Sequence, residues 1–415
     1  MTPQTEITRW SDLTSDQQQA MLTLLEKMEQ GQSLLSLSGH AGTGKTTALR
    51  VLVDLLVDRG IIPVVVTPTN KAATVLQSKG VSAATVFARF FTLEEVSRRP
   101  KKMTFVPNYQ LEKLGAGKIS QADVVIVDEG SMLNSWVLKH LQKMADILIL
   151  VGDGAQLPPV GDIDNPRGYF CTRKHDAELT QVLRNDGAVL HLATAVRTSQ
   201  DGRRIGLDID AYYPGDDFET LFVLDRPQLI CWRNVIRRAL NVRARKTLGI
   251  TGVLPVPGDL MICRDNYDDL LLNGTQATLE SFTWDGSGRT AEVVLVLSDG
   301  TRTLADMDML RFFEDQPPAQ VRQYLDLIER YSHGDEEGAA LTYGYAITAH
   351  AAQGGEWPHV VVVDEREGIY STSKRNFAEN PRNVPPDDAC RRWAYTAISR
   401  ARETVYVADE RWMKY

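Results

Sequence analysis

The residues best suited to chemistry lie in the stretch GHAGTGKTT, residues 39–47. Gly39, Gly44, Lys45 and Thr46 fit the phosphate-loop pattern G-x-x-x-x-G-K-[ST], in which glycines let backbone N–H groups curl around phosphate oxygens at a helix N-terminus. The Lys45 ammonium can reach the outer phosphates of a nucleotide, and the hydroxyl of the following threonine can bind Mg²⁺. The pattern therefore predicts a nucleotide site. Its remaining members are Ala41, Gly42, Thr43 and Thr47.

A second pair of reactive side chains follows the apolar run 124–127. Asp128 and Glu129 stand at the carboxyl end of this predicted strand, downstream of the phosphate loop. Asp128 can hold Mg²⁺ through water, and Glu129 can orient or deprotonate the water that attacks a γ-phosphate. The two acids therefore predict hydrolysis of the bound nucleotide.

Short apolar runs alternate with helical patterns around these residues. Residues 34–37 predict a buried strand before the phosphate loop, and residues 46–59 predict a helix after it. Further strands are expected at 61–66, 124–127 and 147–151. This alternation predicts an α/β fold, a parallel sheet with helices on both faces.

The second half of the chain predicts another α/β region and two insertions. Strands at 229–231, 360–363 and 404–407, with helices at 234–248 and 388–399, form the second region. Residues 256–313 have alternating patterns and glycine turns, which suggest a small β-barrel. The expected domains are 1–90 with 119–170, an inserted hairpin at 91–118, 171–255 with 341–415, and the barrel insertion at 256–340.

Composition narrows the class of protein. The 415 residues suit two main domains, the four cysteines form no C-x-x-C pair, and no apolar run approaches a membrane span. We expect an intracellular, cytoplasmic protein with no membrane association. The net charge of −8 leaves room for a local basic groove, and basic clusters at 98–102 and 233–246 are either such a groove or solvated faces.

Seven motifs in order complete the pattern. They are GHAGTGKTT, TPTNKAA (67–73), DEGS (128–131), GDGAQLPPV (152–160), LTQVLR (179–184), YAITAHAAQGGE (345–356) and YTAISRAR (395–402). In this order the chain resembles superfamily 1 helicases, and among them the RecD/Dda-like branch. The resemblance implies two RecA-like domains with ATP and Mg²⁺ between them, a β-hairpin insertion in the first and an SH3-like barrel in the second.

The resemblance also implies roles at the ATP site. Gln17 would read adenine, Gln156 would sense the γ-phosphate, and Glu356 would join the nucleotide-binding set. Arg184 and Arg400 would approach the γ-phosphate and stabilise negative charge as the phosphoryl group leaves.

A nucleic-acid track is implied in the same way, because single strands are held by backbone contacts and by faces on which bases lie. Its candidate residues are Thr67, Thr69, Asn70, Thr85, Phe87, Asn234, Thr348, His350 and Gln353. Phe87 could equally be a core residue, and Phe87 and Ala351 replace a histidine and a basic residue common in relatives. In the hairpin, Met103 or Phe105 could form the tip of a strand-separating pin, or the segment could be a plain surface loop.

These features predict an ATP-dependent DNA helicase moving 5′ to 3′, with the polarity implied only by the resemblance. Its expected partners are single-stranded DNA, single/double-strand junctions and replication or recombination proteins, and we expect a monomer. An RNA helicase of the same superfamily is the alternative. A P-loop kinase or GTPase would lack the second α/β domain, and an inactive motor subunit would lack the intact Lys45, Asp128 and Glu129.

Overall fold

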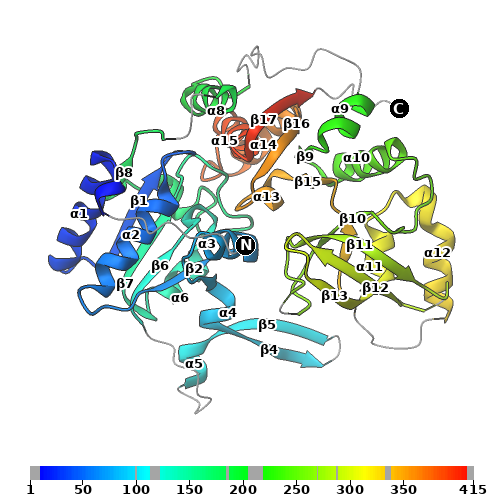
Figure 1. The fold of residues 1–415 in the computed structure, drawn as a ribbon, viewed down its shortest axis with the longest axis horizontal. Helices are drawn as coiled ribbons and strands as arrows, with labels where there is room; N and C mark the ends of the chain where they lie inside the picture. The colour runs from blue at the N-terminus through cyan, green and yellow to red at the C-terminus, as the bar shows by residue number, and fades with distance from the viewer. Residues whose placement is uncertain are drawn as a thin grey trace. The chain divides into compact units, whose positions relative to one another are not determined.

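The protein is described by a computed structural model covering residues 10–98, 101–112, 122–183, 187–203, 218–268, 270–286, 288–331 and 338–408. The chain forms two compact units (Figure 1). The first contains Met1–Ile205 and Glu367–Ser399, and the second contains Gly206–Arg366 and Arg400–Tyr415. In these described ranges, no helix combines the length and the apolar character that crossing a membrane requires.

The first unit is built on a six-stranded parallel sheet, as the alternation predicted. Its order is β3-β2-β6-β7-β1-β8. Because β8 pairs with β1, this sheet extends beyond the expected boundary at residue 170. The strands are β1 (Leu34–Gly39), β2 (Val64–Thr67), β3 (Ala84–Thr85), β6 (Ala122–Val127), β7 (Ala145–Gly152) and β8 (Ala177–Leu179).

Helices cover both faces of this sheet, and each face has its own hydrophobic core. One core packs α1 and α2 against the sheet, and the other packs α4 and α6 against it. Helices α8 and α15 lie side by side within the same unit (Figure 1). The helices are α1 (Ser15–Glu29), α2 (Lys45–Val57), α3 (Asn70–Ser78), α4 (Val86–Phe90), α5 (Asn108–Glu112), α6 (Ser135–Leu141), α7 (Tyr169–Thr172), α8 (Ala188–Thr198), α14 (Arg366–Glu379) and α15 (Pro386–Ile398).

The predicted hairpin is present between α4 and α5. Strands β4 (Phe91–Arg98) and β5 (Lys101–Pro107) pair in antiparallel fashion, with Phe91 opposite Pro107 and Arg98 opposite Lys101. The pairing of Arg98 with Lys101 is thus the end of the described hairpin that lies farthest from α4 and α5.

The second unit combines two sheets. A parallel sheet has the order β15-β9-β16-β17, and an antiparallel sheet has the order β13-β12-β11-β10-β14. The parallel strands are β9 (Gln228–Cys231), β15 (Ala346–Thr348), β16 (Trp357–Val363) and β17 (Ala401–Ala408). The antiparallel strands are β10 (Leu260–Cys263), β11 (Gln276–Thr283), β12 (Thr290–Leu297), β13 (Arg302–Asp308) and β14 (Leu341–Tyr343). The helices are α9 (Phe218–Asp225), α10 (Asn234–Thr247), α11 (Met309–Glu314), α12 (Pro318–Tyr331) and α13 (Ala349–Ala352).

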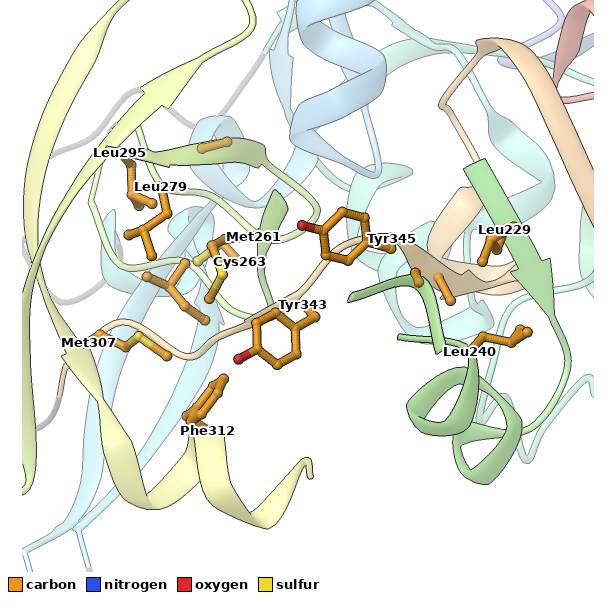
Figure 2. Close-up of a cluster of buried hydrophobic side chains, with 14 of the residues drawn as sticks. Leu229, Leu240, Met261, Cys263, Leu279, Leu295, Met307, Phe312, Tyr343 and Tyr345 are labelled. Atoms are coloured by element: carbon orange, nitrogen blue, oxygen red, sulfur yellow. The ribbon is translucent and has the colours of Figure 1, made fainter. Parts of the chain in front are cut away.

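The two sheets of this unit share one hydrophobic core (Figure 2). Tyr343 closes the antiparallel side, where its ring centroid lies 5.4 Å from that of Phe312. Tyr345, two residues later, packs toward the parallel sheet, and Leu229 and Leu240 continue the core there. Strand β14 thus belongs to the antiparallel sheet, whereas the sequence predicts that residues from 341 onward belong to the second α/β domain. The chain passes from one sheet to the other at Gly344.

Candidate functional site

The phosphate loop joins β1 to α2, and its geometry explains its glycines. Gly44 has φ of 74°, a left-handed conformation that favours glycine, and a Cβ there would stand 2.5 Å from Nε2 of Gln17. The Lys45 ammonium donates to the carbonyl oxygens of Gly39 (2.9 Å) and His40 (3.0 Å). The cation is therefore held over the loop, where a phosphate group would need it.

Gln17 is buried and ties the start of α1 to the phosphate loop. Its Oε1 accepts from the Thr14 N–H (3.1 Å), and the Thr14 hydroxyl accepts from the Gln17 N–H (3.3 Å), which is a capping box. Its Nε2 donates to the Thr43 carbonyl (3.1 Å). Both ends of the amide thus have partners within the protein, and adenine recognition by Gln17 stays a prediction.

Asp128 and Glu129 follow β6 at the same edge of the sheet. Burial and the adjacent Glu129 carboxylate raise the pKa of Asp128 from its ordinary 3.8 to about 7. Glu129 has φ of 57°, which is rare outside glycine and typical of functional sites.

Three buried oxygens near these acids have no hydrogen-bond partner among the described residues. They are Oε2 of Glu129, Oγ of Ser131 and Oε1 of Gln156. A buried polar atom without a partner costs about 1–3 kcal/mol, so such atoms are uncommon unless they serve a ligand or water. Because β6, β7 and β1 are neighbours in the parallel sheet, these oxygens lie at the sheet edge that also carries Thr46 and the Asp128 carboxylate, and oxygen groups of this kind can bind Mg²⁺.

Asp153 is the most buried acid of the loop that follows β7. It accepts from the Ala155 N–H (3.0 Å), from Nη1 of Arg197 and from the hydroxyl of Tyr395. Burial alone would raise its pKa, but the charges of Lys45 and Arg197 and the tyrosine hydrogen bond hold the pKa of Asp153 below its ordinary value. The carboxylate is therefore a fixed negative charge beside the phosphate loop.

Helix α15 is fastened to this same loop. The Thr396 hydroxyl accepts from the Leu157 N–H (2.9 Å), and Nη1 of Arg392 donates to the carbonyls of Gly154 (2.6 Å) and Gln156 (3.0 Å). Sequence reasoning did not single out these contacts. Tyr395 and Thr396 stood within a recognised motif that could have signalled them, whereas Arg197 belongs to none of the motifs.

In the first unit, the candidate nucleic-acid residues gather at one edge of the sheet, because Thr67 of β2 pairs in register with Thr85 of β3. Thr69 and Thr85 cap α3 and α4 by accepting from the N–H groups of Ala72 (3.3 Å) and Ala88 (3.1 Å). Thr67 is fully buried, and its hydroxyl donates to the Thr69 carbonyl (2.7 Å), so it shapes the turn. Asn70 is the first residue of α3. Two helix N-termini, which favour phosphate, thus open at this edge.

Phe87 packs against the hairpin. Its ring centroid lies 4.5 Å from that of Phe105 and 5.2 Å from that of Phe91. Phe105 pairs with Leu93, which places it toward the base of the hairpin rather than at its turn. The packing interpretation of Phe87 thereby gains support, and the side chain of Met103 lies outside the described residues.

In the second unit, Thr348 caps α13 by accepting from the Ala351 N–H (3.4 Å), and it lies next to Cys231 of β9 in the sheet. Burial lowers the pKa of His350, which favours the neutral imidazole. Gln353 is buried, whereas Asn234 is exposed at the start of α10 and accepts from Nε of Arg237 (3.0 Å).

The two predicted arginines of the ATP site differ in what the structure shows. Arg400 is 5% exposed, and its Nη1 donates to the Gly355 carbonyl (3.4 Å), next to the exposed Glu356. Arg184 lies outside the described residues.

The basic cluster at 233–246 is neither a free groove nor a solvated face. Five of its arginines form ion pairs inside the second unit, and two of them, Arg237 and Arg245, are almost completely buried; Arg238 shares Asp315 with Arg237. The pairs are Arg233 with Glu365, Arg237 with Asp315, Arg243 with Glu219, and Arg245 with Asp259.

The sequence matches the family model described as an AAA domain over residues 12–216, about half of the chain. It is 26% identical over 200 residues to the ATP-dependent DNA helicase Dda of phage T4, covering 46% of this chain and 44% of Dda. It is 24% identical over 404 residues to the ATP-dependent RecD2 DNA helicase of Deinococcus radiodurans, covering 91% of this chain and 47% of RecD2. The chain thus spans less than half the length of these relatives.

Among solved structures, the fold is similar to Pif1 helicase from Bacteroides in complex with ADP-AlF3 and ssDNA, with a TM-score of 0.55, 16% identity, and coverage of 95% of this chain and 92% of that chain. Pif1 helicase from Candida albicans gives a TM-score of 0.50 at 18% identity, with coverage of 95% and 94%. At this identity the likeness concerns the fold, a mixed α/β architecture with RecA-like domains. The order of the motifs and the sequence relatives are both similar to superfamily 1 helicases of the RecD/Dda-like branch, and the fold is similar to that of Pif1 helicases.

Proposed function

We propose that this protein is an ATP- and Mg²⁺-dependent motor that moves 5′ to 3′ along single-stranded DNA and unwinds duplex. The observation that carries the proposal is the edge of the first sheet where β1, β6 and β7 end: the phosphate loop follows β1, and Glu129 and Gln156 have buried oxygens without a partner among the described residues. A strained acid with a free buried oxygen is what an enzyme needs to position an attacking water.

The proposed roles are those that the motifs and the family resemblance imply. Lys45 neutralises phosphate charge, and Thr46 and Asp128 hold Mg²⁺, which when bound polarises the phosphoryl oxygens. Glu129 takes the proton of the attacking water. Gln156, Arg184 and Arg400 respond to the γ-phosphate, the two arginines by stabilising its developing charge.

The track is proposed from helix N-termini. The capped starts of α3 and α4 at one sheet edge, and the Thr348 turn beside β9 in the other unit, offer backbone N–H groups to phosphates. Asn70, Asn234, His350 and Gln353 complete the proposed set. Replication or recombination proteins are proposed as partners. We also propose that the protein is monomeric and cytoplasmic.

The hairpin β4–β5 and the antiparallel sheet belong to the proposal as well. The hairpin would separate the strands of a duplex, and the five-stranded sheet would be an SH3-like barrel. The phenyl ring of Phe105 supports the base of this hairpin through Phe87, so the wedge itself would lie nearer the turn, where Met103 is the candidate.

The test is steady-state ATP hydrolysis with no polymer, with single-stranded DNA and with single-stranded RNA, at two salt concentrations. We expect stimulation by DNA that falls with salt, because phosphate contacts release counterions. Lys45→Ala should lower the stimulated rate by about 10²-fold or more, the order of loss expected for a major electrostatic contact, with an unchanged melting temperature. Retained turnover in this variant would refute the site.

Two further outcomes decide the substrate and the mechanism. Equal or greater stimulation by RNA would move the proposal to an RNA helicase. If DNA stimulates, unwinding of duplexes with 5′ or 3′ overhangs tests polarity. Met103→Ala tests the hairpin, since a pin variant should lose unwinding but keep stimulated hydrolysis.

A further inference from the structure

A single buried hydroxyl links the phosphate loop to the loop after β7. Tyr395 is 1% exposed. Its oxygen accepts from the Ala41 N–H of the phosphate loop (3.1 Å), and its O–H donates to the Asp153 carboxylate. The hydroxyl therefore uses both its acceptor and its donor capacity, in two segments that are far apart in the sequence.

The surroundings hold this tyrosine in one orientation. The Arg197 guanidinium lies 5.5 Å from its ring centroid and forms an ion pair with Asp153. Charge-assisted hydrogen bonds of this kind are stronger than neutral ones and keep their geometry when water is excluded. The link between Ala41 and Asp153 is therefore stiff.

Tyr395 also belongs to a helix with further contacts to the same loop. One residue on, Thr396 accepts from Leu157, and one turn earlier Arg392 holds the carbonyls of Gly154 and Gln156. Helix α15 ends at Ile398, and Arg400 follows two residues later. Tyr395 therefore connects α15 to the phosphate loop, and the chain continues from the end of α15 through Ser399 to Arg400, the arginine proposed to meet the γ-phosphate.

We propose that Tyr395 is a positioning residue whose hydroxyl registers the phosphate loop against Asp153, so that a change in the loop on nucleotide binding is passed through α15 toward Arg400. The inference rests on the proposed function and adds a residue to it. Tyr395 does not touch the reacting atoms. It sets the geometry of groups that do.

The test compares Tyr395→Phe with Tyr343→Phe. The first variant keeps the ring and its contact with Arg197 and removes only the hydroxyl. Tyr343 is a matched control, because it is similarly buried and donates to the Val253 carbonyl (2.7 Å) in the other unit. Three quantities are measured: DNA-stimulated kcat and KM, the Kd of a fluorescent ADP analogue, and amide hydrogen exchange of the peptide containing Ala41.

In Tyr395→Phe we expect kcat to fall about tenfold while the Kd for the ADP analogue changes by less than about twofold, because misplaced groups slow chemistry more than they weaken binding. Exchange at Ala41 should accelerate about tenfold or more as its hydrogen bond is lost. Tyr343→Phe should leave all three unchanged.

Other results would overturn the inference. A kcat within about twofold of wild type, or a Kd that rises by the same factor by which kcat falls, would show that Tyr395 contributes only to packing. If Tyr395→Phe does not fold, amide hydrogen exchange of the wild-type protein without nucleotide tests the inference. Fast exchange at the Ala41 amide would contradict its hydrogen bond to the Tyr395 hydroxyl. Failure of the proposed function looks different: the wild type itself would show no stimulated hydrolysis, while Ala41 protection would still report on the hydroxyl.

Discussion

At the scale of single residues, adjacent Asp128 and Glu129 show how one strand end creates two unlike acids. Burial and the adjacent charge of Glu129 disfavour the ionised form of Asp128, which raises its pKa to about 7. Glu129 takes a left-handed backbone conformation that leaves one buried oxygen without a partner among the described residues. Both features lower the stability of the folded protein, which is typical of residues that bind ligands rather than of residues that stabilise the fold.

This argument predicts a pH effect at Asp128. Because its folded pKa is higher than its unfolded pKa, ionisation opposes folding, and stability is lost as the pH rises from about 4 to about 7. Asp128→Asn removes that loss. Above pH 7 the variant should be more stable than the wild type by up to ~4 kcal/mol, and near pH 4 the two should agree.

Urea denaturation without nucleotide, at pH 4, 5, 6 and 8, measures this difference. Asp58→Asn, at an exposed carboxylate after α2, is the control. If the difference in unfolding free energy between wild type and Asp128→Asn is the same at all four pH values, the pKa of Asp128 is not raised in the folded protein.

At the scale of elements, α10 illustrates how a basic helix can be structural. Arg237 and Arg245 are buried and pair with Asp315 and Asp259, which lie just after α11 and just before β10. Tyr345 adds a hydrogen bond to Asp259 (2.9 Å). These ion pairs join α10, which packs on the parallel sheet, to segments that flank the antiparallel sheet.

Breaking one such pair should be costly. Arg237→Ala leaves the Asp315 carboxylate without its main partner, and we expect a loss of about 3–5 kcal/mol in unfolding free energy. Arg238→Ala is a close control, because Arg238 is more exposed and lies 3.6 Å from the same carboxylate. This control should cost no more than ~1 kcal/mol. Equal losses in chemical denaturation would contradict the buried-pair interpretation.

The same helix shows where sequence reasoning succeeds and where it stops. Periodicity predicted α10 at 234–248, and the structure has it at Asn234–Thr247. Composition could not tell which arginines meet acids, since Arg237 and Asp315 are 78 residues apart. The phosphate loop was predictable because its chemistry depends on local spacing. The Tyr395 link was not, because its three residues are brought together only by tertiary packing.

At the scale of the whole molecule, the first unit is assembled from two separate chain segments, 1–205 and 367–399. Gly202, near the end of the first segment, packs directly on the start of α15 in the second. A methyl group added at Gly202 would overlap the Asp387 carbonyl. The absence of a side chain therefore lets the two segments approach each other.

Gly202→Ala should accordingly destabilise the protein by about 1–3 kcal/mol, the usual cost of overpacking. It should also speed amide exchange in α15. Gly252→Ala is the control, because a Cβ there meets open space. Thermal unfolding of both variants checks the prediction, and an unchanged melting temperature in Gly202→Ala would refute the close packing.

The two-segment construction also has a consequence for the order of events during protein synthesis. Ala41 and Tyr395 are separated by 354 residues. At a translation rate of ~5–20 residues per second, the phosphate loop would leave the ribosome roughly 20–70 s before its tyrosine partner. During that interval a nascent chain would carry the nucleotide motif without α15, and the hydrogen bonds of Tyr395 to Ala41 and Asp153 could form only afterwards.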